Sequence, residues 1–151
     1  MIYDRTTDDV ESARKIIREK VQKFLELTEE EIQTLEKGTM TVNTLNRIEN
    51  KQEELKNRLN SIGYWNIGTT NKNWNNSLVF KSEELRRVIE NVNVLRESFL
   101  VYKNTPTTPK AVYYYENINA VEKILNDLGV MIDDVKSKYR ECGNFQCGEA
   151  S

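Results

Sequence analysis

Apolar residues recur every three or four positions along most of the chain, which is the spacing of one face of an α-helix. This pattern predicts helices over roughly 10–25, 42–62, 83–103 and 112–139, with a shorter helix between 28 and 38. We therefore expect an all-α fold, specifically an antiparallel helical bundle or coiled coil. The first helix is expected to bury Val10, Ala13, Ile17, Val21, Phe24 and Leu25 on one face.

Three of these helices carry apolar residues at alternating spacings of three and four, as in the seam of a coiled coil. The first seam contains one polar position, Gln52, and the last continues through Gly129, where the helix either bends or ends and restarts in phase. The seam residues are Leu45, Ile48, Leu55, Leu59 and Ile62; Leu85, Val88, Val92, Leu95, Phe99 and Tyr102; and Tyr114, Ile118, Val121, Leu125, Leu128, Ile132, Val135 and Tyr139.

The stretches without this spacing divide the chain. Residues 64–81 form a predicted long loop rich in asparagine, and residues 141–151 a predicted irregular tail. We expect an N-terminal helical hairpin over 1–63 and a C-terminal helical hairpin over 82–140. The second hairpin would pack on the first, as one bundle or as two subunits.

Aromatic residues outside the seams are the candidate contacts with a partner. Both tryptophans, Trp65 and Trp74, lie in the loop, where they either close one end of the bundle or contact another protein. The polar segment before the first helix is either a simple lead-in or an insertion into a neighbouring subunit. The candidate partner-binding residues are Ile2, Tyr3, Asp4, Arg5, Trp65, Trp74 and Phe145.

The composition excludes several classes of function but says little more about the fold. The chain of 151 residues is 38% apolar and 30% charged, and its net charge is −2. It has no histidine, which excludes Ser-His-Asp and Cys-His triads and histidine-ligated zinc. Lysine and arginine are interleaved with acidic residues, an arrangement that argues against a nucleic-acid binder. No apolar run reaches 18 residues, so we expect no membrane span.

No motif of catalysis is present in the sequence. It lacks a glycine-rich phosphate loop and a nucleophile elbow, and its acidic runs fit helix capping and solvation. We therefore expect a protein that is not an enzyme and that has no cofactor and no metal. Cys142 and Cys147 are expected as free thiols or as a disulfide within the tail. With no signal peptide evident, the chain is expected to be made in a cytoplasm.

Two helical segments are similar to each other. Residues 45–49 (LNRIE) and 118–122 (INAVE) both place an asparagine three positions before a glutamate, next to a seam. A duplicated helical unit and a chance agreement both explain this similarity. Asn46 and Asn119 could each bond a neighbouring backbone or set the register of a partner.

Five segments, taken in order, resemble a known family: 2–10 (IYDRTTDDV), 45–49, 91–96 (NVNVLR), 115–125 (YENINAVEKIL) and 142–149 (CGNFQCGE). The family comprises small structural proteins from the tail modules of phages, or phage-tail-like bacteriocins, of clostridia-like Gram-positive bacteria. The order of the segments carries the resemblance, and the loop over 64–80 departs from it. The family offers no catalytic residues.

The resemblance implies a non-enzymatic structural subunit in the baseplate or tail-fibre attachment region, incorporated in the virion or particle. Its partners would be other tail, baseplate or fibre proteins, in a homo- or hetero-oligomer. A trimer that packs through one seam is one of the expected arrangements. The alternatives are a tail-fibre assembly chaperone absent from the mature particle, and a helical adaptor or regulator.

Overall fold

The protein is all-helical in the residues that its computed structural model describes, which are 1–65, 67–75, 81–112 and 114–142, with side chains as far as residue 138. This confirms the predicted fold class. The elements in chain order are α1 (Thr7–Glu19), the 3₁₀ turn η1 (Val21–Lys23), α2 (Glu29–Gly38), α3 (Val42–Asn60), α4 (Ser82–Ser98) and α5 (Tyr115–Cys142).

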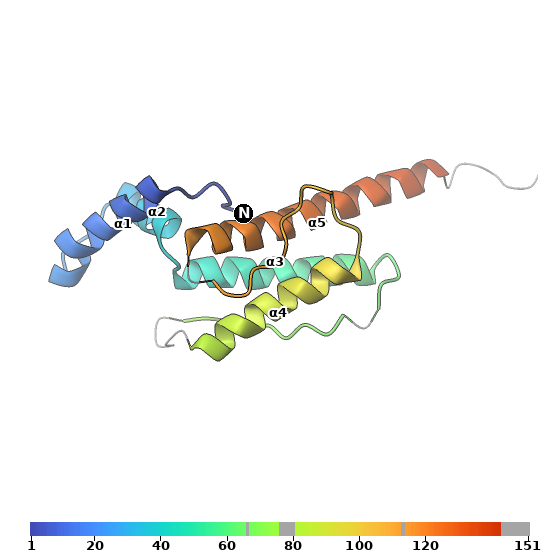
Figure 1. Cartoon of the computed structure of the whole chain (residues 1–151), viewed down its shortest axis with the longest axis horizontal. Helices are drawn as coiled ribbons and strands as arrows, with labels where there is room; N and C mark the ends of the chain where they lie inside the picture. Colours follow the sequence, from blue (N-terminus) through green and yellow to red (C-terminus); the bar gives the residue numbers. More distant parts are fainter. Residues whose placement is uncertain (66, 76–80, 113, 143–151) are drawn as a thin grey trace, which may run out of the picture.

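Helices α3, α4 and α5 contact one another and run in the same direction (Figure 1). Arg47 bonds Glu122 and Arg58 bonds Asp133, two pairs with the same separation of 75 positions, as parallel helices require. The prediction of antiparallel neighbours is therefore wrong for these three helices. Short connections make neighbouring helices antiparallel, whereas the segments after α3 and α4 are long enough to return along the whole helix.

The core lies between these three parallel helices, and the seam residues form most of it. In each seam the residues from the middle of the helix are buried, while Phe99 and Tyr102 lie beyond the end of α4 and are half-buried. Gln52 is also buried, where its Nε2 donates to the Val88 carbonyl at 2.9 Å and its Oε1 accepts from Asn91 at 3.2 Å. The seams are thus occupied within one chain.

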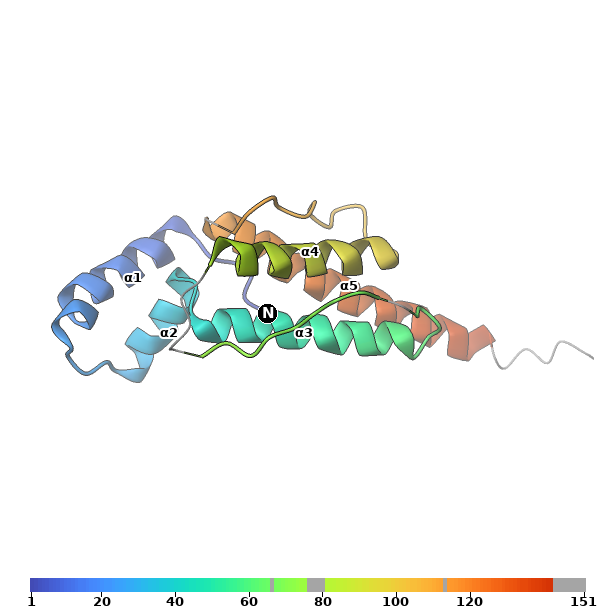
Figure 2. The same cartoon turned by 90° about the horizontal axis from the view of Figure 1, so that it is seen from below.

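Helices α1 and α2 form a separate antiparallel hairpin that projects from one end of the three parallel helices (Figures 1 and 2). Lys20 at the end of α1 pairs with Glu31 at the start of α2 at 2.7 Å. At the other end of the hairpin the two backbones meet at Gly38. A Cβ atom there would lie 2.2 Å from the Asp9 carbonyl oxygen and 2.4 Å from the Ala13 Cβ.

Capping determines where α1 and α2 begin. Thr6 and Asp9 form one capping box, and Thr28 and Glu31 form the other, so that each helix has its first N–H groups satisfied by side chains. The far end of α1 differs from the prediction of a helix as far as residue 25. The helix ends at Glu19, and the apolar residues that follow do not join a buried face.

The last helix is continuous through Gly129, which decides between the two alternatives left open by the sequence. A Cβ atom at Gly129 would be in ordinary contact with Leu55 and Arg58 of α3, and the Arg58 guanidinium donates to the Gly129 carbonyl at 3.0 Å. Packing of α5 against α3 therefore offsets the low helix propensity of glycine.

Candidate interaction surface

The tip of the α1–α2 hairpin exposes four apolar side chains. Phe24 is 97% exposed, and Val21, Leu25 and Ile32 are all more than one third exposed. These residues follow one another around the turn from η1 into α2, at the end of the hairpin farthest from the core. Exposed apolar residues gathered in one place are typical of a protein–protein contact, whereas isolated ones are ordinary.

The backbone at Phe24 adds a second unusual feature to this tip. Phe24 has φ 55° and ψ 33°, and it is the one residue other than glycine with positive φ in the described part of the chain. A left-handed conformation costs a residue with a side chain roughly 1–2 kcal/mol. The chain thus bends sharply at Phe24, and it does so without burying the ring.

A buried polar cluster on α5 holds the N-terminal segment. The Asn119 side chain pairs with both backbone groups of Arg5: its Oδ1 accepts from the amide at 3.2 Å, and its Nδ2 donates to the carbonyl at 2.9 Å. One turn further along, fully buried Glu122 accepts from Arg5 Nη1 at 2.5 Å and from Arg47 Nε at 2.9 Å. Arg5 is consequently buried against α5.

The equivalent residues of α3 hold the loop in the same way. Asn46 pairs with both backbone groups of Trp74, at 2.8 and 3.0 Å. Buried Glu49 accepts from Trp74 Nε1 at 2.8 Å and from Arg87 Nη2 at 2.6 Å, and also from the Lys72 amide. Both similar segments therefore bind the backbone of a segment outside the helices, one of the two roles expected for these asparagines.

Arg87 connects α4 to this cluster. Burial disfavours its charge and acts to lower its pKa, but the hydrogen bonds and the negative charge of Glu49 outweigh burial and raise the pKa above its ordinary value. Arg87 therefore stays charged, and Glu49 has a permanent cationic partner.

The structure separates the predicted partner-binding residues. Trp74 is buried, with 4% of its surface exposed, whereas Trp65 is 71% exposed. Tyr3 and Asp4 are exposed, and they lie near Lys123 and Lys37 respectively. Ile2 is half-buried, and its carbonyl accepts from Arg5. Phe145 lies outside the described residues.

Sequence reasoning missed the hairpin tip because it assigned Val21, Phe24 and Leu25 to a buried helical face. One signal was available. The capping box at Thr28 fixes the start of α2, so little chain is left for the reversal before it. Continuing the first helix to residue 25 would leave only two residues for that turn.

The two carboxylates that cap the hairpin helices, Asp9 and Glu31, have lowered pKa values. The hydrogen bond from Thr6, followed by that from Lys37, keeps the pKa of Asp9 below its ordinary value even though burial acts in the opposite direction. The hydrogen bond from Lys20 and that from the Thr28 backbone lower the pKa of Glu31 in the same way. Both capping carboxylates are thus charged at neutral pH.

Comparisons of the chain with protein-family models, with curated proteins and with solved structures give no match. Within the described residues, no group of three or more His, Cys, Asp or Glu side chains is placed to hold a metal ion. None of the described helices is both long enough and apolar enough to cross a membrane. The distinctive features of the described residues are the exposed hairpin tip and two clasps, which are Asn119 with Glu122 on α5 and Asn46 with Glu49 on α3.

Proposed function

We propose that the chain is a non-enzymatic structural subunit of a phage tail or phage-tail-like bacteriocin particle, in the baseplate or tail-fibre attachment region. It would be made in the bacterial cytoplasm and would act by packing against other tail proteins. The observation that carries the proposal is the projecting hairpin, whose apolar tip at Phe24 is uncovered while the three parallel helices already have a core of their own.

The three parallel helices and the α1–α2 hairpin differ in a way that supports this proposal. We infer that α3, α4 and α5 act as a three-helix bundle with coiled-coil-like seams, over which the long loop is fastened by Asn46 and Glu49. Because its seams are occupied, this bundle is a rigid base, and a trimer through one seam is no longer the packing we favour. The hairpin is then the part that reaches a partner.

The proposal names tail proteins because five segments of the sequence, in order, resemble a family of phage tail proteins. Two of those segments, 45–49 and 115–125, contain the asparagine and glutamate that form the buried clasps. A third, residues 2–10, contains Arg5, the residue that the α5 clasp holds. The segments that carry the resemblance thus include the residues that hold the N-terminal segment and the long loop against the helices.

Quantitative mass spectrometry of particles purified from the encoding bacterium tests the proposal. A structural subunit is expected at a fixed ratio to the tail-tube protein. A chain abundant in the lysate but absent from finished particles would instead be an assembly chaperone. A chain that neither enters particles nor alters their assembly when deleted would refute a role in tails.

A further inference from the structure

One side of the α1–α2 hairpin is apolar on both helices. The close contact of Gly38 with Ala13 marks the surfaces by which the two helices face each other. Counting by the helical repeat from that contact, Ile17 on α1 and Leu35 and Ile32 on α2 turn toward the same side of the hairpin. Ile32 is exposed there, and Ile17 and Leu35 are half-buried. Val21 follows in η1, beyond the end of α1, and adds a fourth apolar side chain, which is exposed at the tip. We call these four residues the hairpin face.

The two edges of the hairpin face carry opposite charges. Arg14 and Arg18 lie beside it on α1, and Glu29 and Glu36 lie beside it on α2. Among the described residues, Arg14, Arg18 and Glu29 form no ion pair, and Glu36 is bonded by the neutral side chain of Asn43. The face is thus bordered by one basic and one acidic edge whose charges are not neutralised within the chain.

This charge pattern is complementary to itself. Two copies related by a two-fold axis can stack their hairpin faces with α1 on the partner's α1, which brings the two basic edges together. They can also stack with α1 on the partner's α2, which places each basic edge on an acidic edge. Because like charges at an interface cost free energy and opposite charges select a partner, only the second arrangement satisfies both the apolar and the charged residues.

We propose that the hairpin face binds a second copy of this chain, with α1 on the partner's α2, to form a four-helix unit. This inference deepens the proposed function by naming the first partner, and it rests on the same projecting hairpin. The face is about 20 Å long and about 20 Å wide, as two helices of this length imply. Two such faces would bury about 800 Å² in total, below the roughly 1,200–2,000 Å² of standard interfaces and in the range of transient ones, so the dimer is weak and reversible.

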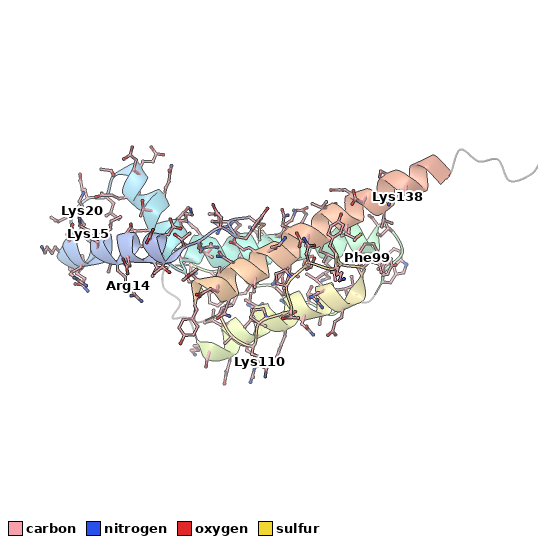
Figure 3. The ribbon with its side chains drawn as sticks, turned by 45° about the horizontal axis from the view of Figure 1, so that its top comes forward. Arg14, Lys15, Lys20, Phe99, Lys110 and Lys138 are labelled. Carbon is pink, nitrogen blue, oxygen red and sulfur yellow. The ribbon has the colours of Figure 1, made fainter. Side chains whose placement is uncertain are left out.

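Sedimentation equilibrium of the full chain, over micromolar to high-micromolar concentrations, tests this dimer. Arg18→Glu and Glu29→Lys should each weaken it about tenfold at low salt, because each change alters two symmetry-related contacts. Lys138→Glu is the matched control, since this exposed lysine lies on α5 toward the far end of the molecule from Arg14, Lys15 and Lys20 (Figure 3). It should leave the affinity unchanged.

Mixing the two charge-reversed variants gives the decisive result. In a mixed dimer every reversed side chain meets an opposite charge again, so the affinity should return to that of the unaltered chain. Circular dichroism of each variant must show the helical content of the unaltered chain, which excludes loss of the hairpin as the cause. A chain that stays monomeric at every concentration, or a dimer that neither reversal weakens, overturns the inference.

The two proposals fail in different experiments. A chain that is monomeric in solution but present at a fixed ratio in particles refutes the dimer and leaves the tail-subunit proposal standing. A chain that dimerises through the hairpin face but is absent from particles refutes the structural-subunit proposal alone.

Discussion

Glu49 is the residue whose removal tests the account of the loop most severely. It is buried, and it accepts hydrogen bonds from Trp74 Nε1, Arg87 and the Lys72 amide. Glu49→Ala removes all of these acceptors at once, leaves the Trp74 Nε1–H without its partner, and leaves Arg87 with Glu84, at 3.3 Å, as its remaining carboxylate. Breaking a buried ion pair by deleting one member typically costs about 3–5 kcal/mol. We expect the free energy of unfolding to fall by about that amount, a large share of the roughly 5–15 kcal/mol of an ordinary domain.

Urea unfolding followed by circular dichroism measures this loss, and tryptophan fluorescence shows where it occurs. In a Trp65→Phe background the remaining emission comes from buried Trp74, and Glu49→Ala should shift it toward the red before the helices unfold. Glu54→Ala is the matched control on the same helix. Glu54 is half-exposed and pairs with Lys51 and Arg58, so its loss should cost at most about 1 kcal/mol.

The result that would refute this reasoning is specific. If Glu49→Ala destabilises the chain no more than Glu54→Ala does, Glu49 is not a buried acceptor and the loop is not fastened to α3 through it. The same conclusion would follow if Glu49→Ala left the Trp74 emission spectrum unchanged at urea concentrations below the unfolding transition.

Three further changes test other parts of the molecule. Asn119→Ala should cost about 1–3 kcal/mol by leaving the buried Arg5 backbone unpaired, and it should raise hydrogen exchange at that residue; unchanged exchange would contradict the clasp. Gly38→Ala should separate α1 from α2, since its Cβ would overlap the Ala13 Cβ; heteronuclear NMR should show loss of dispersion confined to 7–38, and an unchanged spectrum would show that the close approach is absent. Lowering the pH below about 4 should loosen the hairpin, because both of its capping boxes use a charged carboxylate. The pKa values of Asp9 and Glu31 are lower in the folded than in the unfolded chain, so the folded state binds fewer protons, and the stability they contribute above the unfolded pKa is lost as the pH falls through the folded one. An NMR pH titration in which the signals of residues 7–38 stay unchanged as the pH falls below about 4 would contradict this.

The sequence was sufficient to locate the helices and most of the core. Leu45, Leu55, Val92 and Leu125 are buried where their spacing places them, because burial of one apolar stripe is what stabilises a helix in water. Spacing carries no information on direction, however. Whether two helices run parallel depends on the path of the chain between them, and the loop fastened at Trp74 follows a path that a hydrophobic pattern does not record.

The candidate surface was harder to predict than the fold. A pattern count treats Phe24 as one more apolar residue in register, and only the turn forced by the next capping box removes it from the helix. Arg5 is the opposite case, since it is buried although a charged side chain in a polar segment before a helix is normally exposed. Its burial depends on Glu122, a residue more than a hundred positions away.

Incorporation of altered chains into particles tests the central claim, which is that the chain works by packing its hairpin against other proteins. Phe24→Ser removes the most exposed apolar side chain of the tip, and Leu100→Ser removes another exposed apolar residue outside the hairpin as a control. Each altered chain is expressed together with an isotope-labelled unaltered chain, and the ratio of the two in purified particles is measured by mass spectrometry. The account predicts that the Phe24→Ser chain is depleted from particles and that the Leu100→Ser chain enters in proportion to its supply. Equal incorporation of the unaltered, Phe24→Ser and Leu100→Ser chains would contradict it.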